Sequence, residues 1–356
     1  MDLDKILKVA VRGGASDVLL KIGERPRFRF HGELVTLSDG TPVSKDIIET
    51  WAKQIMPPRL VPRLETAGDA DFAYQTPSGY RFRVNIFRQR QNLGMVMRVV
   101  SGHVRTLEEL QLPKILTNLS REKRGLILVT GATGSGKTTT LAAMIQKINV
   151  ERAAHIITIE DPIEFIFKDE RATVNQREIG LDAVSFGSAL RAALRQNPDV
   201  ILVGELRDKE TTECALMAAE TGHLVLSTLH TTDAVESLTR LLSYFPAELH
   251  HSVRQTLGQS LKAVISQRLV SRNDKKGLVA AHEILISSAN VRSHIEKGSD
   301  FAGVKTLIEN GKEAYGMCTF DDSLLQLFRE GIISEDEVLA QSSSRGDIQL
   351  KLHGVA

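Results

Sequence analysis

The stretch LILVTGATGSGKTTTLAAMIQKI, residues 126–148, decides the predicted fold. Within it, GATGSGKT at residues 131–138 fits the pattern GxxxxGK[ST]. It follows a strand-like apolar run and opens a helical run, which is the context that this motif needs. The glycines allow consecutive backbone N–H groups to turn toward a phosphate, and the N-terminal end of the following helix adds its dipole. The sequence therefore predicts a P-loop, with these nucleotide-binding residues: Gly131, Thr133, Gly134, Ser135, Gly136, Lys137, Thr138 and Thr139.

Two residues of this loop have individual predicted roles. The ammonium group of Lys137 is expected to reach the β and γ oxygens of ATP, and the hydroxyl of Thr138 is expected to ligate Mg²⁺. The alternative is an ordinary glycine-rich turn, but at average glycine usage the pattern arises by chance in roughly one random chain per hundred. ATP and Mg²⁺ are therefore the predicted cofactors.

Four short apolar runs share a strand-like length and alternate with helical stretches; they are LILVT, HIITI, DVILVG and HLVLST. This alternation is typical of a parallel sheet covered by helices on both faces. The predicted fold class is α/β, with a RecA-like P-loop ATPase core over residues 116–285. Residues 1–104 are predicted to form a small α+β (PAS-like) N-terminal domain, residues 105–115 a linker, and residues 286–356 a helical C-terminal appendage.

Acidic residues follow two of the predicted strands. Glu205 ends the run DVILVGE and suits the Walker B role, beside Mg²⁺ and its waters. The segment ITIEDPIEF carries Glu160, Asp161 and Glu164 at the same expected edge of the sheet. An isolated acidic turn is usually only solvated, but here we expect one of these carboxylates to orient the attacking water. Glu164 is the favoured base and Glu160 the second choice.

Histidines and arginines supply further candidates. In TGHLVLSTLHT, His230 follows a strand and is expected to contact the γ-phosphate, whereas His223 precedes it and is equally well explained as a hydrogen-bonded loop histidine. In the N-terminal domain, Arg81 and Arg83 share one strand face and Arg98 lies in a later strand. Solvated arginines on sheets are common, but these three are candidates for reaching the γ-phosphate across a subunit boundary.

Composition limits the function classes. Lys and Arg number 45 against 44 Asp and Glu, and aromatic residues make up 5%, which argues against a DNA or RNA translocase and against direct nucleic-acid binding. The two cysteines, Cys214 and Cys318, form no CxxC motif, so neither a disulfide framework nor a zinc site is predicted. No window approaches the ~18 consecutive apolar residues of a membrane span, so we expect a cytoplasmic protein that contacts a membrane only through partners.

Four motifs in order, GATGSGKT, ITIEDPIEF, NPDVILVGELRD and TGHLVLSTLHT, resemble the secretion-ATPase superfamily, and specifically the type IV pilus retraction ATPases of the PilT/PilU kind. The resemblance covers nearly the whole chain. It implies a homohexameric motor at the cytoplasmic face of the inner membrane, which withdraws pilin subunits through a membrane platform protein. It also implies roles for matching residues: essential carboxylates at Glu164 and Glu205, a histidine box of His223 and His230, and trans-acting arginines at Arg83 and Arg98.

Related motors remain alternatives. The chain lacks the long N-terminal extension and the four-cysteine zinc insertion of pilus-assembly and type II secretion ATPases, which favours the retraction type. The segment NVRSHIEK, residues 290–297, departs from the AIRNLIRE signature of the main retraction ATPase, so an accessory paralogue, acting beside another retraction ATPase, stays open. A ring component that binds ATP without hydrolysing it would have lost Lys137, Glu164 or Glu205, and all three are present.

Overall fold

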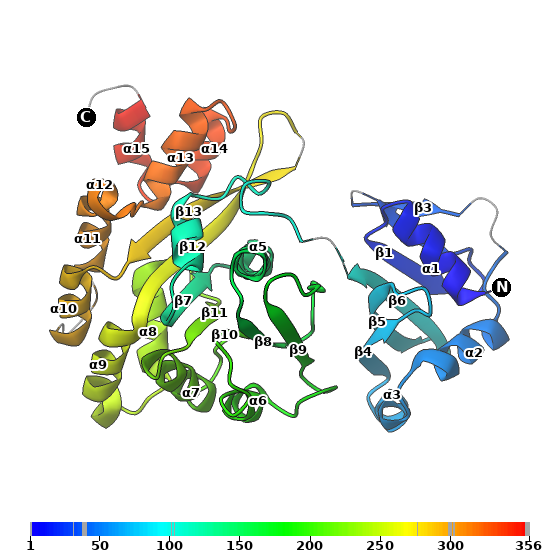
Figure 1. The fold of residues 1–356 in the computed structure, drawn as a ribbon. Helices are drawn as coiled ribbons and strands as arrows, with labels where there is room; N and C mark the ends of the chain where they lie inside the picture. Colours follow the sequence, from blue (N-terminus) through cyan, green and yellow to red (C-terminus); the bar gives the residue numbers. More distant parts are fainter. Residues whose placement is uncertain are drawn as a thin grey trace. The chain divides into compact units, whose positions relative to one another are not determined.

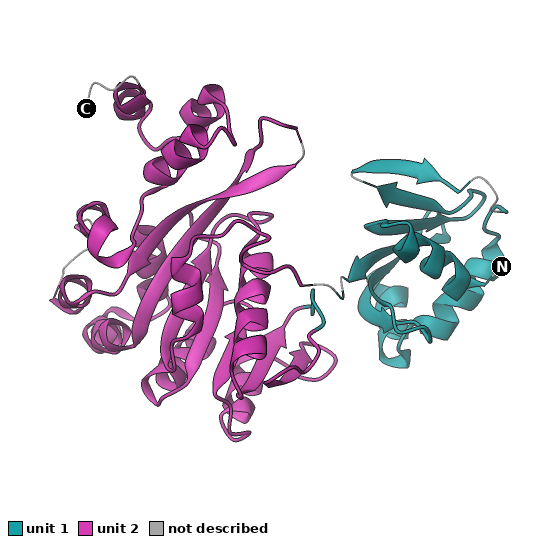
Figure 2. Ribbon diagram, turned by 45° about the horizontal axis from the view of Figure 1, so that its top comes forward, with its two compact units in different colours: residues 1–103, 162–166 teal, residues 104–161, 167–356 magenta. Residues whose placement is uncertain are grey.

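The chain folds into two compact units in the computed structural model, which describes residues 2–30, 32–37, 41–100, 102, 104–275, 277–297, 301 and 303–352. The first unit comprises residues 1–103 and 162–166, and the second comprises residues 104–161 and 167–356 (Figure 2). The stretch 105–115, predicted as a linker, thus belongs to the second unit. Ser101 and His103, at the predicted junction, lie outside the described residues.

The first unit contains an antiparallel sheet in the order β3-β2-β1-β6-β5-β4, with helices beside it (Figure 1). Its elements are α1 (Leu3–Arg12), β1 (Asp17–Lys21), β2 (Arg27–Phe30), β3 (Glu33–Thr36), α2 (Lys45–Ile55), η1 (Pro58–Leu60), α3 (Val61–Thr66), β4 (Asp69–Gln75), β5 (Arg81–Gln89) and β6 (Asn92–Val100). The strands β2 and β3 are close in the sequence and pair as antiparallel neighbours.

Alternation along β5 explains why this sheet has one buried face. Phe82, Val84 and Ile86 are fully buried and share a core cluster with helix residues such as Leu7 and Ile48. Because successive side chains of a strand point to opposite faces, the arginines at odd positions of β5 lie on the face away from this core.

The second unit is built on a seven-stranded sheet in the order β13-β12-β7-β11-β10-β8-β9. Its strands are β7 (Gly125–Thr130), β8 (His155–Glu160), β9 (Thr173–Glu178), β10 (Val200–Val203), β11 (Leu224–Leu229), β12 (Leu261–Ser271) and β13 (Leu278–Ile286). All neighbouring strands pair in parallel except β12 and β13, which pair antiparallel. The strands β9, β12 and β13 were not among the predicted runs.

Helices cover this sheet and extend to the C-terminal end (Figure 1). They are α4 (Ile115–Ser120), α5 (Lys137–Glu151), α6 (Phe186–Ala193), α7 (Lys209–Glu220), α8 (Ala234–Ser243), η2 (Ala247–Leu249), α9 (His250–Ser260), α10 (Ala289–Lys297), α11 (Val304–Asn310), α12 (Lys312–Tyr315), α13 (Phe320–Arg329), α14 (Glu335–Gln341) and α15 (Arg345–Leu352). Helices α10 and α11 join the main core through Val291, Ile295 and Val304. By contrast, α13–α15 form a separate cluster on Val270 and Val279 of β12 and β13.

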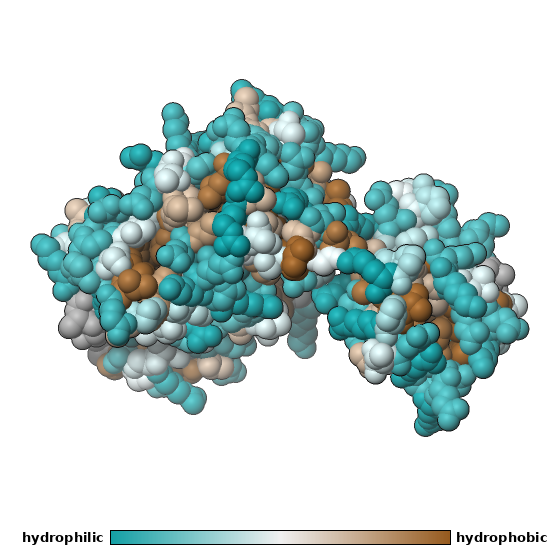
Figure 3. Space-filling view, turned by 90° about the horizontal axis from the view of Figure 1, so that it is seen from below, coloured by the Kyte–Doolittle hydropathy of each residue, from teal (hydrophilic) through white to brown (hydrophobic). Residues whose placement is uncertain are grey.

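The molecular surface is mainly hydrophilic on the face drawn in Figure 3, where hydrophobic residues form small separate groups. Among the described helices, none combines the length and the apolar character that crossing a bilayer requires.

One buried histidine makes stability depend on pH. His282 on β13 is 2% exposed, and burial lowers the pKa of its imidazole to about 4. The unfolded chain binds a proton near pH 6.5, and the folded chain binds it only near pH 4, so stability is lost as the pH falls through this window. We expect the free energy of unfolding to drop by about 2 kcal/mol between about pH 7.5 and about pH 5 through this group alone.

Urea denaturation of the wild type and His282→Leu at both pH values measures this effect. The variant should lose that share of the pH dependence, whereas His251→Leu, at an exposed position, should keep it. The same pH dependence in wild type and His282→Leu would show that the folded chain accommodates the charged imidazole.

Candidate functional site

The P-loop joins the end of β7 to the start of α5 through glycines in conformations that other residues avoid. Gly131 has φ 144° and Gly136, the N-cap of α5, has φ 87°. A Cβ atom at Gly131 would collide with the carbonyl oxygen of Gln267 and the hydroxyl of Ser135. The glycine pattern therefore serves both the backbone path and the close packing of the loop against β12.

Lys137 closes the loop on itself. Its side chain is largely buried, and Nζ donates hydrogen bonds to the carbonyl oxygens of Gly131 (2.7 Å) and Ala132 (2.9 Å). The hydroxyl of Ser135 is also buried and has no hydrogen-bond partner among the described residues. A cation and an unused hydroxyl donor thus lie within one loop, which suits an anionic ligand.

Gln267 on β12 holds the loop in place. Its side chain is 2% exposed; its Nε2 donates to the carbonyl oxygen of Ser135 (2.6 Å), and its Oε1 accepts from the hydroxyl of Thr140 (2.7 Å). Sequence reasoning missed this residue, because β12 itself was not predicted. The apolar run at residues 263–265 was the available signal for that strand.

Gln267→Ala should weaken the fold at this loop. The change leaves the Ser135 carbonyl and the Thr140 hydroxyl without their partner in a buried place, so we expect a loss of about 2–4 kcal/mol in unfolding free energy. Urea denaturation would measure it. Gln326→Ala, which removes an exposed side-chain hydrogen bond to Glu330, is the matched control and should cost less than about 0.5 kcal/mol. Equal losses of unfolding free energy in the two variants would contradict a stabilising role of the two Gln267 hydrogen bonds.

Glu205 and His230 meet at the same edge of the sheet. Glu205 follows β10 and His230 follows β11, the strand between β10 and the P-loop strand β7. Glu205 Oε2 lies 3.3 Å from Nε2 of His230, and Oε1 pairs with Arg207 at 2.5 Å. The carboxylate side chain is 10% exposed whereas the imidazole is 53% exposed. A nearly buried carboxylate thus orients an accessible imidazole beside the P-loop strand.

The three acidic candidates after β8 differ in their surroundings. Glu160 is buried and its Oε1 accepts from the Thr158 hydroxyl (2.6 Å) and from Gln176 Nε2 (3.1 Å). Asp161 and Glu164 are exposed, and Glu164 belongs to the short segment 162–166 that groups with the first unit. Glu160 is therefore engaged in local structure, whereas Glu164 has an accessible carboxylate.

His223 lies at the opposite edge of the sheet from His230. It precedes β11, where its Nδ1 is 3.0 Å from the carbonyl oxygen of Ala218, and a strand of six residues separates it from His230. At about 3.3 Å per residue the two histidines are roughly 23 Å apart along the strand. The structure therefore does not bring His223 to the P-loop edge.

The candidate arginines lie in the first unit. Arg83 of β5 is exposed and is directly opposite Arg98 of β6 in the strand register, and Arg81 shares its strand face. Arg98 Nε donates to Asp17 Oδ1 at 2.9 Å, although its side chain stays 68% exposed. An acidic neighbour thus orients one of the two facing guanidinium groups.

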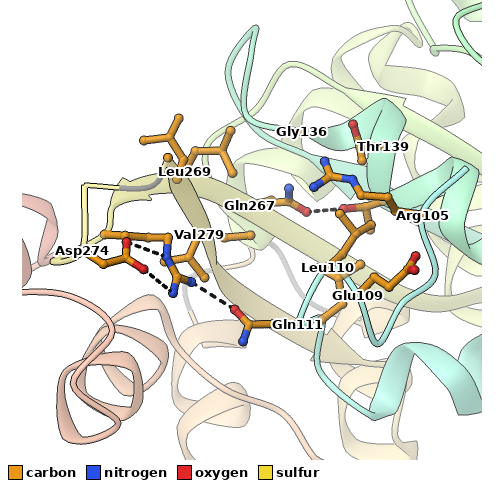
Figure 4. A pocket seen from close by; sticks show the side chains of 16 residues that line it. Arg105, Glu109, Leu110, Gln111, Gly136, Thr139, Gln267, Leu269, Asp274 and Val279 are labelled. Carbon is orange, nitrogen blue, oxygen red and sulfur yellow. Dashed lines mark hydrogen bonds and ion pairs between the residues drawn. The ribbon is translucent and has the colours of Figure 1, made fainter. Parts of the chain in front are cut away.

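Two pockets flank the P-loop and share the lining residues Gln267, Leu269 and Leu278. The P-loop pocket, about 390 Å³, is lined by residues 131–135, Thr232, Gln267–Leu269, Leu278 and Gln341. The larger pocket, about 610 Å³, lies between residues 105–112, the start of α5 and the β12–β13 hairpin (Figure 4). Gly136, Thr139 and Thr140 of the P-loop region line this second pocket.

A turn at residues 106–112 forms one wall of the larger pocket. Thr106 and Glu109 cap each other, since the Thr106 hydroxyl accepts from Glu109 N and the Glu109 carboxylate accepts from Thr106 N. Gln111 Oε1 accepts from Arg272, which also pairs with Asp274 (Figure 4). Contacts on both sides hold this wall firmly in the second unit.

Comparison with known proteins shows the family of this chain. The family described as type II/IV secretion system protein matches residues 1–312. The chain belongs to this family. PilU of Pseudomonas aeruginosa, described as a type IV pilus ATPase, is 40% identical over 352 residues, covering 99% of this chain and 91% of that protein. PilT of the same organism, described as a type IV pilus retraction ATPase, is 42% identical over 336 residues, covering 94% and 96%.

A crystal structure of the pilus retraction motor PilT with bound ADP matches this secretion ATPase with a TM-score of 0.89 and 38% identity, covering 98% of this chain and 99% of that one. These findings confirm the predicted resemblance, the α/β fold class and the ATPase assignment. Nucleotide binding therefore belongs to this secretion ATPase as a member of the family.

Proposed function

We propose that this protein is a motor that hydrolyses MgATP to power the retraction of type IV pili. The observation that carries the proposal is that the P-loop with Lys137, His230 and Glu205 follow the neighbouring parallel strands β7, β11 and β10 at one edge of the sheet, where Glu205 contacts His230. Similarity to PilU and PilT over nearly the full chain supports the pilus assignment. The two identities, 40% and 42%, are close, so the accessory paralogue is the second candidate.

The two pockets divide the nucleotide between them in this proposal. The phosphates occupy the P-loop pocket, where Lys137 and the backbone N–H groups of residues 131–136 face them. The adenosine end enters the larger pocket beside Thr139. The Thr138 hydroxyl and the Glu205 carboxylate, the latter partly through water, are oxygen donors of the kind that Mg²⁺ prefers. The ion, when bound, neutralises charge on the β and γ phosphates.

The carboxylates take different roles in hydrolysis. Glu164 accepts a proton from the water that attacks the γ-phosphorus, and ADP leaves as the bond to its β-phosphate oxygen breaks. Glu160 supports the acidic segment through its hydrogen bonds with Thr158 and Gln176. His230, oriented by Glu205, contacts the γ-phosphate, and Asp161 lies beside the base in the sequence.

The assembly is proposed as a homohexamer at the cytoplasmic face of the inner membrane, acting on the pilus through a platform protein. Arg83 and Arg98 of one subunit reach the γ-phosphate in the next, with Arg81 as a supporting residue. Asp17 contacts Arg98, which stays exposed, and the strand register places Arg98 opposite Arg83; both observations support a paired guanidinium site.

Two measurements test this function. Purified chain should hydrolyse ATP in the presence of Mg²⁺ and, with nucleotide, scatter light as a hexamer. In a piliated bacterium without its own retraction ATPases, expression of the chain should restore pilus shortening under fluorescence microscopy. Shortening that also requires PilT would favour the accessory role, and ATP binding without turnover would contradict the motor.

Mixing variants tests hydrolysis across subunits. Lys137→Ala chains keep their arginines, and Arg83→Ala chains keep their P-loop, so a mixed ring contains interfaces where both functional halves meet. We expect an equimolar mixture of the two inactive variants to recover ATPase activity, with Arg98→Ala in place of Arg83→Ala as a parallel mixture. A mixture as inactive as its components would contradict action in trans.

A further inference from the structure

The C-terminal helices contribute to the lining of the P-loop pocket. Arg268 of β12 lines this pocket, and so does Gln341, the last residue of α14. The loop residues 131–135 line the same space. Any phosphate in this pocket is therefore bounded by a guanidinium-bearing residue and by the end of a helix that is about 200 residues away in the sequence.

Arg268 contacts two of those helices. Its guanidinium carbon lies 4.0 Å from the ring centre of Phe320, the first residue of α13, in a cation–π contact. Its Nη1 donates a hydrogen bond of 3.1 Å to the carbonyl oxygen of Gln341. One planar cation thus contacts α13 through its face and α14 through its edge.

A second contact fixes α14 to the same strand. Glu337 Oε1 accepts from the backbone N–H of Ser271 at 3.1 Å and from Gln341 Nε2 at 3.3 Å. Phe320 is 2% exposed and belongs to the separate cluster of α13–α15 with β12 and β13. The helices therefore meet the pocket wall through a small set of directional contacts and not only through apolar packing.

We propose that Arg268 is a positioning residue that couples phosphate binding at the P-loop to the packing of α13 and α14. A bound phosphate attracts the guanidinium, which also contacts the Phe320 ring and the Gln341 carbonyl oxygen, so the ligand restricts the motion of both helices. Coupling between two sites is reciprocal. If a bound nucleotide stabilises the packing of α13 and α14, a change that loosens this packing lowers the nucleotide affinity in turn. The inference rests on nucleotide binding in the proposed function.

Hydrogen exchange, measured by mass spectrometry on the full chain with and without saturating ADP, tests nucleotide binding and the proposed coupling separately. Slower exchange in peptides covering residues 131–145 reports that ADP is bound at the P-loop. Slower exchange in peptides covering residues 320–341 reports the coupling. We expect both in the wild type.

Two variants distinguish an effect of the positive charge of Arg268 from an effect of its contacts with the helices. Arg268→Lys keeps the positive charge but loses the planar stack, so P-loop protection should remain while the ADP effect on residues 320–341 disappears. Phe320→Leu removes the stack from the helix side and should weaken binding of fluorescent ADP about fivefold, although Phe320 does not line the pocket. Arg329→Lys, an exposed conservative change in α13, is the matched control and should behave as the wild type.

Protection of the P-loop without a change in residues 320–341 of the wild type overturns the coupling and leaves the proposed function intact. An unchanged P-loop at saturating ADP overturns both. Full retention of the ADP effect in Arg268→Lys also overturns the coupling, because charge alone would then explain the role of Arg268.

Discussion

Replacing Lys137 with alanine is expected to lower ATP hydrolysis by at least about 100-fold, because the substitution removes the only ammonium group within the P-loop sequence. The variant should still fold, because the carbonyl oxygens of Gly131 and Ala132 that Lys137 contacts border a pocket, where water can replace the ammonium group. Release of phosphate from MgATP at saturating concentration measures turnover, and fluorescent ADP measures affinity.

Lys123→Ala is the matched control for this change. Lys123 is exposed and precedes β7, so the substitution removes the same charge from the same unit without touching the loop. The control should hydrolyse ATP at the wild-type rate. If Lys137→Ala retained more than about a tenth of the wild-type activity, the loop at residues 131–138 would not be the main catalytic nucleotide site.

Replacing Glu164 with glutamine is expected to reduce kcat by about 100-fold or more while ADP affinity stays within about twofold of wild type. The amide has the shape of the carboxylate but cannot accept the proton of the attacking water. Steady-state kinetics and ADP titration on the same preparation separate the loss of turnover from any loss of binding.

Glu160→Gln and Asp161→Asn complete this series. Glu160→Gln should mainly lower stability, by about 1–2 kcal/mol, because a neutral amide oxygen accepts the hydrogen bonds from Thr158 and Gln176 more weakly than the carboxylate does. Asp161→Asn, at an exposed position, should reduce kcat only a few-fold. The assignment of the base moves to Glu160 if Glu160→Gln folds with wild-type stability and loses turnover while Glu164→Gln does not.

The fold was predictable where local pattern and spatial arrangement coincide. In parallel strands the carboxyl ends share one edge, so the order of motifs along the chain already places the residues after β7, β10 and β11 together. That is why Glu205 and His230 could be grouped from the sequence. The same rule places His223, before β11, at the far edge.

The pocket walls were not predictable for a different physical reason. β12 carries Ser266, Gln267 and Arg268 in succession, so its polar residues hide the strand pattern. These side chains are tolerated inside because their partners come from distant segments: Thr130 for Ser266, the P-loop for Gln267, and α13 and α14 for Arg268. No local period encodes such pairings. The contact of Arg98 with Asp17, 81 residues apart, is equally invisible in the sequence.

The turn at residues 106–112 has a consequence for protein engineering. The turn lines the larger pocket and is held in the second unit by Glu108, which pairs with Lys147 of α5 at 3.6 Å, and by Gln111, which accepts from Arg272, although it directly follows the first unit in the sequence. A chimera that exchanges the first unit with that of a relative should therefore be joined near residue 104. A junction near Pro113 would also replace the turn at residues 106–112. Effects of the changed pocket wall could then not be separated from effects of the exchanged unit.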